Sequence, residues 1–176
     1  MDNKPNGCKS NDCKSNDFEL DDLNMELMAL DGKRYHCSQI MMILGLRLLG
    51  RDAAQNADLI RAAGGLTFGL GHSNETCGAL LGGACFLGLY GGKGHDGEEE
   101  AEWFRMSVRR LVDWFRETYA EAGEDGTPSI RCADILNRRG LKQCGLMVRG
   151  VYSKVLELLD EYRVDPSEGR SGSAAS

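Results

Sequence analysis

Four cysteines, each near the start of a segment with helical periodicity, constrain this chain more than any other feature. They are Cys37, Cys77, Cys132 and Cys144. A thiol at a helix start lies at the positive end of the helix dipole, which favours the thiolate, the form that binds metals and attacks disulfides. No two of them have Cys-x-x-Cys spacing, so a shared site would have to be assembled from distant segments of the fold.

Cys37, Cys132 and Cys144, each taken alone, are more simply interpreted as small buried hydrophobic residues. Four thiols at comparable helix starts favour a common site. Cys85 follows Cys77 by eight residues, which on one helix means about 12 Å along the axis. A disulfide needs Cα atoms within about 7 Å, so we read Cys85 as a core residue. Cys8 and Cys13 are expected to be thiols of an N-terminal tail.

Charge and cysteine content narrow the classes of function. The net charge of −6 argues against nucleic acid or an anionic membrane as the main partner. The first residues have no apolar segment typical of a secretory signal, and no run of about 18 apolar residues is present. We therefore expect a soluble, cytoplasmic protein. In a reducing compartment, seven cysteines indicate metal, cluster or redox chemistry.

The hydrophobic periodicity is helical and predicts an all-α fold. Residues 1–17, with a tandem Cys-Lys-Ser-Asn-Asp repeat, and residues 164–176 are expected to be flexible tails. Residues 18–163 should form one compact bundle of about six helices. The expected segments are about 19–30, 32–49, 57–63, a helix capped by Ser73 or Asn74 and running to Tyr90, 98–122, a short helix from Thr127-Pro128, and 143–162.

The segment 74–90 has small residues at four-residue spacing, among them Gly78 and Gly82. Glycine inside a helix costs up to about 1 kcal/mol relative to alanine, so another backbone is expected to pack closely against it. That backbone could belong to this chain, to a partner or to a second copy. Trp103 and Trp114 share one helix face and could anchor a homodimer.

Several other chemistries find no support. The glycine-rich loop 65–71 lacks the GxGxxG spacing and the lysine of phosphate-binding loops. Ser38 and Ser73 have no matched base and acid, so hydrolase chemistry is not indicated. His36 and His72 could each supply a nitrogen ligand, although a lone histidine is more often a surface or capping residue.

The order of these motifs resembles the C-GCAxxG-C-C family of redox-active proteins. The resemblance covers about residues 33–160 and rests on Cys37-Ser38-Gln39, the glycines of 64–71, Cys77-Gly78-Ala79-x-x-Gly82-Gly83, Cys132 and Cys144. The family label spells Gly-Cys-Ala where this chain reads Cys77-Gly78-Ala79. A similar domain occurs in split-Soret cytochrome c, where an iron–sulfur centre accompanies the haems. This chain has no Cys-x-x-Cys-His, so covalent haem is not expected.

The resemblance implies a small helical domain in which Cys37, Cys77, Cys132 and Cys144 are the cofactor and metal ligands. Four thiolates match the requirement of an iron–sulfur cluster, with zinc or no metal as alternatives. The leading hypothesis is electron transfer or redox sensing with a redox partner protein. A metal-free thiol–disulfide switch, with Cys132–Cys144 as the first pair and arginines 138 and 139 nearby, is the second. A structural or interaction role is the third.

Overall fold

The protein is described here by a computed structural model, which covers residues 12–169. Residues 1–11 and 170–176, parts of the two expected tails, lie outside the described residues. The first helix already begins at Asp12, inside the segment expected to be a tail. At the other end, residues 164–169 contact the bundle, and the hydroxyl of Tyr90 donates to the carbonyl of Pro166 at 2.8 Å. Helix α1 and the contacts of residues 164–169 thus lie partly outside residues 18–163, and the bounds of the folded domain stay a prediction.

The fold is mostly helical, as expected, but the described residues contain eight α-helices rather than about six, and a small hairpin. In chain order the elements are α1 (Asp12–Gly32), α2 (Cys37–Leu48), α3 (Ala57–Gly64), α4 (Thr67–Leu70), α5 (Gly78–Gly91), α6 (Phe104–Tyr119), β1 (Glu121–Ala122), β2 (Pro128–Ser129), α7 (Cys132–Arg139), the 3₁₀ turn η1 (Leu141–Gln143) and α8 (Cys144–Glu161). No helix within residues 12–169 is both long and apolar enough to cross a membrane.

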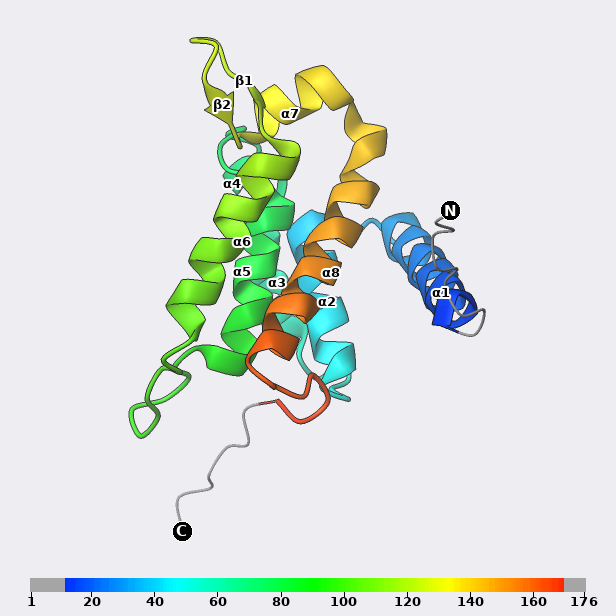
Figure 1. The fold of residues 1–176 in the computed structure, drawn as a ribbon, viewed down its shortest axis with the longest axis vertical. Coiled ribbons are helices and arrows are strands. Elements are labelled where there is room, and N and C mark those ends of the chain that lie inside the picture. The colour runs from blue at the N-terminus through cyan, green and yellow to red at the C-terminus, as the bar shows by residue number, and fades with distance from the viewer. Residues whose placement is uncertain (1–11, 170–176) are drawn as a thin grey trace, which may run out of the picture.

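Helices α2 and α5 form the centre of the bundle, and α6 and α8 pack around them (Figure 1). Residues 40–46 of α2 are buried, which confirms the expectation of a central helix there. The largest side chains of the core are fully buried and come from all four helices: Met41, Leu44, Phe86, Leu87, Leu111, Phe115, Val151 and Leu158. Burial of such side chains contributes about 1.5–3 kcal/mol each relative to exposure.

The small residues of α5 pack against other helices of the same chain. A Cβ atom at Gly82 would lie 2.8 Å from the Cα of Ser38, and one at Gly83 would lie 2.5 Å from Val151. Glycine at these positions lets α2 and α8 approach the backbone of α5 closely. The small-residue face therefore does not remain free for a partner, although the homodimer itself stays a prediction.

Several expected boundaries are wrong, because turns or a hairpin occupy the residues expected to begin a helix. Helix α2 begins at Cys37 and not near Gly32, where α1 ends. Helix α5 begins after Cys77 and not at Ser73 or Asn74. Helix α6 begins at Phe104 and not near residue 98. Residues expected to start a helix at Thr127-Pro128 instead form β2, which pairs antiparallel with β1.

Helix α1 lies to one side of the bundle and contacts α2 and α8 through its C-terminal half (Figure 1). Leu27 and Leu30 are buried there. Glu26 forms an ion pair with Arg47 of α2. These contacts place the end of α1 next to the start of α2, where the first of the four cysteines lies.

Candidate cysteine centre

Cys37 is the first residue of α2. The backbone N–H of His36, which precedes it, donates to the side-chain oxygen of Gln39 at 3.3 Å, as in a capping box. The next residue, Ser38, is fully buried and donates its hydroxyl to the carbonyl of Ala63 at 2.8 Å. The start of α2 is thereby fixed against α3, and this fixes the position of Cys37.

Cys77 and Cys132 are positioned together. Cys77 caps α5 and Cys132 is the first residue of α7. The N–H of Cys77 donates to the carbonyl of Ile130 at 3.0 Å, and the N–H of Cys132 donates to the carbonyl of Glu75 at 2.6 Å. A short backbone pairing, invisible to local sequence patterns, thus places two helix starts side by side.

Cys144 is the first residue of α8 and directly follows η1. The four expected positions at helix starts are therefore confirmed: three cysteines are the first helical residue and Cys77 is the cap. All five cysteines from residue 37 onward are free thiols.

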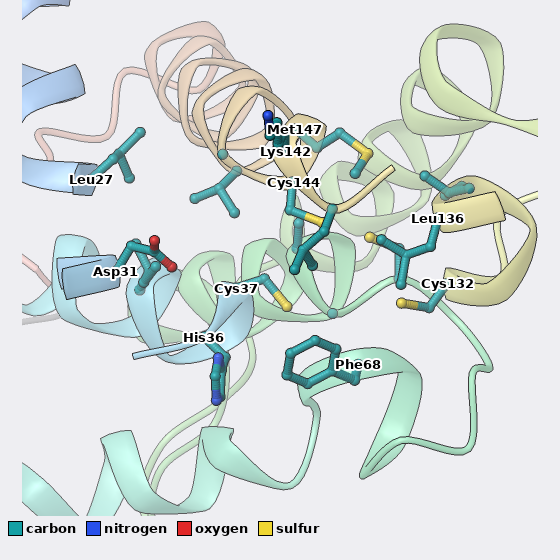
Figure 2. Close-up of a pocket in the computed structure, with 18 of the residues that line it drawn as sticks. Leu27, Asp31, His36, Cys37, Phe68, Cys132, Leu136, Lys142, Cys144 and Met147 are labelled. Atoms are coloured by element: carbon teal, nitrogen blue, oxygen red, sulfur yellow. The ribbon is translucent and has the colours of Figure 1, made fainter. Parts of the chain in front are cut away.

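All four thiols line one cavity of about 450 Å³, and Cys85, half-buried on α5, does not. Figure 2 shows the side chains of Cys37, Cys132 and Cys144 reaching into this space from α2, α7 and α8. The rest of the wall is mostly apolar and comes from seven helical elements and the loop between α1 and α2: Leu27, Met28, Tyr35, Ile40, Phe68, Ala79, Ile135, Leu136, Leu141, Met147 and Val148.

The Cys-Gly-Ala-x-x-Gly motif has a steric explanation in this cavity. A Cβ atom at Gly78 would lie 2.5 Å from the sulfur of Cys37 and 2.8 Å from the carbonyl oxygen of Leu66. Ala79 is 1% exposed. Gly82, one turn further on, lets α2 pack against the helix backbone. The small residues of the motif thus allow Cys37 to lie directly over the start of α5.

Burial dominates the acid–base behaviour of the thiols. It raises the pKa of Cys77 to about 12 and that of Cys144 to about 11. It also raises the pKa of Cys37 and of Cys132. Removal from water disfavours the charged form of a thiol. All four are therefore protonated near neutral pH in the metal-free protein.

Backbone amides at the helix starts lower the pKa of the thiols, in the direction opposite to burial. Those of Ala79 and Leu80 lower the pKa of Cys77, and that of Phe68 lowers the pKa of Cys37. The expectation that a helix start favours the thiolate is correct for the contribution of these amides. It is wrong for the net shift, because the pKa of each thiol is raised. Side chains from other segments desolvate the sulfurs by more than the local N–H groups compensate.

The negative charge of a Cys37 thiolate raises the pKa of Cys77, Cys132 and Cys144. Like charges interact this way only at short range in a partly buried site. The charge of a Cys132 thiolate likewise raises the pKa of Cys77 and Cys144, so Cys37 and Cys132 each lie near the other three thiols. Arg139, expected to help a thiolate at Cys132 or Cys144, instead pairs with Glu121 at 2.6 Å.

The donor set is one that iron–sulfur clusters and zinc both use. Four cysteines are the ligand set of two-iron and four-iron clusters. A single zinc ion needs its four sulfurs within roughly 4 Å of one another. Among the described residues, no three His, Cys, Asp or Glu side chains converge closely enough to hold one metal ion.

Two parts of the site were not singled out by the sequence. Asp31, near the end of α1, lies close enough to raise the pKa of Cys144, and it lines the cavity with Leu27 and Met28. Phe68 lines the cavity from α4. The glycines of the 64–71 loop were a signal for an unusual turn there, whereas nothing in the sequence of α1 indicated a place near the cysteines. Of the two candidate histidines, His36 lines the cavity and His72 stacks on Phe68.

The fold and the site define a small helical protein in which four cysteines, two of them buried and two half-buried, line one cavity. The chain belongs to the family described as "Putative redox-active protein (C_GCAxxG_C_C)", whose model matches residues 35–158. A search of curated proteins and a search of solved structures each return no match to this chain. The match begins after α1, so the α1 wall of the cavity lies outside the part shared with the family.

Proposed function

We propose that this protein holds an iron–sulfur cluster on Cys37, Cys77, Cys132 and Cys144 and serves electron transfer or redox sensing. The observation that carries the proposal is that these thiols, from four helix starts distant in sequence, line one cavity while Cys85 stays outside it. When bound, such a cluster accepts and releases single electrons. The apolar wall would exclude water, and the backbone amides directed at Cys37 and Cys77 would stabilise charge on their sulfurs.

Zinc is the closest variant of this proposal. It uses the same thiolates but needs a tighter arrangement of sulfurs than a cluster does. Within the described residues no group of three His, Cys, Asp or Glu side chains is placed to hold a metal ion, so metal analysis has to separate a cluster from zinc.

A metal-free thiol–disulfide switch is less well supported. The attacking sulfur must be a thiolate, and burial keeps these thiols protonated. Of the two arginines expected to help at Cys132 and Cys144, Arg139 is paired with Glu121. A structural role is also less well supported, because the small-residue face of α5 is occupied within the chain. We place the protein in a reducing, cytoplasmic compartment and expect a redox partner protein.

The test is anaerobic purification followed by iron, acid-labile sulfide and zinc analysis. We expect a coloured protein with iron and sulfide in equal amounts. Substitution of each of the four cysteines by serine should lower the iron content, whereas Cys85→Ser should leave it unchanged. A colourless protein with zinc would select the zinc variant.

A chain that holds no metal after reconstitution would overturn the metal proposal altogether. Mass spectrometry after mild oxidation would then decide the alternative, because a switch requires a Cys132–Cys144 or Cys37–Cys77 linkage. Finding neither metal nor linkage would leave the structural role.

A further inference from the structure

The backbone beside the cavity contains a left-handed turn of five consecutive residues. The φ angles are +50° at Phe68, +65° at Gly69, +62° at Leu70, +62° at Gly71 and +67° at His72. For residues other than glycine this conformation costs roughly 1–2 kcal/mol each. Such strain persists where surrounding contacts impose it, and it gathers at functional sites.

The contacts that impose the turn come from the turn itself and from α7. The N–H of Glu75 donates to the carbonyl of Gly69 at 3.1 Å. The hydroxyl of Ser73 donates to the carbonyls of Gly69 and Leu70 at 2.7 and 2.8 Å. The carbonyl of Glu75 in turn accepts the N–H of Cys132. The turn is therefore tied to one of the four cysteines.

The turn places an aromatic ring at the sulfurs. Phe68 lines the cavity together with the four cysteines, and Figure 2 shows its ring facing the space occupied by the Cys37 and Cys132 side chains. The ring is half-buried and lies between two histidines, with centroid distances of 4.8 Å to His36 and 4.1 Å to His72. The backbone N–H of Phe68 lowers the pKa of the Cys37 thiol through a hydrogen bond to its sulfur.

A comparison with Leu70, two residues further along the turn, shows that only the side chain of Phe68 is directed at the cavity. Leu70 has the same left-handed backbone and an apolar side chain, but it is exposed and does not line the cavity. One strained residue of the turn thus faces the sulfurs and another faces solvent, which offers a matched comparison within a single turn.

We propose that Phe68 is a positioning residue of the cysteine centre: the left-handed turn holds its ring against the cavity and shields Cys37 from water and from reagents. This deepens the proposed function, and the part that concerns a bound cluster rests on it. The shielding of the thiol does not depend on any cofactor.

The first test uses the reduced, metal-free, full-length protein and the disulfide reagent 5,5′-dithiobis(2-nitrobenzoic acid), with the labelled cysteine identified by mass spectrometry. Phe68→Ala should speed the labelling of Cys37 roughly tenfold or more, because a protected thiol reacts in proportion to its opening equilibrium. Leu70→Ala should leave the rate unchanged. Equal rates in the unaltered protein and in Phe68→Ala would overturn the proposal.

A second substitution separates the loss of the ring from a loss of folding. Phe68→Gly removes the ring, but glycine adopts a positive φ without strain. It should therefore speed the labelling of Cys37 while the circular dichroism spectrum stays native. Faster labelling at every cysteine together, with a loss of helical signal, would indicate general unfolding and would count against the positioning role.

The third measurement uses the cluster-loaded protein and its reduction potential. Water stabilises the more negatively charged reduced state, so Phe68→Ala should shift the potential to a less negative value and Leu70→Ala should not. If no variant assembles a cluster, the proposed function fails while the labelling result still decides the role of Phe68. If clusters assemble and neither labelling nor potential changes, the role of Phe68 fails alone.

Discussion

Thr76 and Arg131 form an isolated antiparallel β-bridge, and a cysteine of the cavity directly follows each of them. The bridge joins the approach to α5 with the approach to α7, two segments that are far apart in sequence. Because the backbone of each cysteine takes part in this pairing, Cys77 and Cys132 keep their relative position without a bond between their side chains. The centre is thus organised by the backbone before any ligand is present.

Gly78→Ala should disturb the centre, because its Cβ would lie 2.5 Å from the sulfur of Cys37 and 2.8 Å from a backbone oxygen. We expect a destabilisation of about 1–3 kcal/mol, the usual cost of overpacking, and a loss of iron after reconstitution. Urea unfolding and iron analysis measure the two effects.

Gly145→Ala is the matched control, because Gly145 follows Cys144 as Gly78 follows Cys77. A Cβ there meets nothing within 4 Å. This variant should keep its iron and its stability. Equal iron content in both variants would show that Cys37 does not need its close approach to α5.

Two further glycines of α5 should respond with opposite signs. A Cβ at Gly88 makes only an ordinary contact, 3.8 Å from Phe104, so Gly88→Ala should stabilise the protein by about 0.5–1 kcal/mol through helix propensity. A Cβ at Gly91 would lie 2.8 Å from Phe104 and 3.0 Å from Trp103, so Gly91→Ala should destabilise it. Thermal unfolding of the two variants measures both effects. Stabilisation by both substitutions would contradict the close packing of α5 against α6.

The stability of the reduced, metal-free protein should fall with pH above the usual thiol range. The pKa of Cys77 is raised to about 12 in the folded chain, so the folded state keeps a proton that the unfolded state releases. The contribution of Cys77 to the free energy of unfolding is fully present below the ordinary thiol pKa of about 8.5. It is lost as pH rises toward the folded value, at up to about 1.4 kcal/mol per pH unit.

Urea unfolding between pH 8 and pH 10 measures this slope. Cys77→Ser should reduce it, because serine does not titrate in this range. A stability that is independent of pH over this interval would show that Cys77 is not desolvated.

Leu30→Ala should open the α1 side of the cavity. Leu30 is 2% exposed and is one of the few buried residues that attach α1 to the bundle. Its truncation should cost about 2–4 kcal/mol and speed the labelling of Cys144, which Asp31 of α1 approaches. Hydrogen exchange of α1 should rise in parallel.

Leu159→Ala provides the comparison for α1, because Leu159 is fully buried near the far end of α8. It should lower the overall stability by a similar amount without a selective effect on α1. If both variants change the exchange of α1 equally, α1 does not open as a separate unit.

The sequence by itself determined the helical class of the fold and the place of each thiol at a helix start. Helical periodicity and caps are local properties, so the segments around Cys37, Cys132 and Cys144 were visible without a structure. The small residues after Cys77 also indicated close packing correctly, because glycine in a helix is costly unless a neighbour requires it.

Only the tertiary structure decided that the four thiols line a common cavity and how acidic they are there. The Thr76–Arg131 bridge depends on hydrogen bonds between distant segments, which local propensity does not encode. The net acidity of the thiols also depends on distant segments. Helix-start amides lower the pKa of Cys77, but side chains from other helices bury its sulfur, and that desolvation prevails. The four cysteines were therefore readable from the sequence, whereas the places of Asp31 and Phe68 and the common cavity with its chemistry arise from contacts that form only when the chain folds.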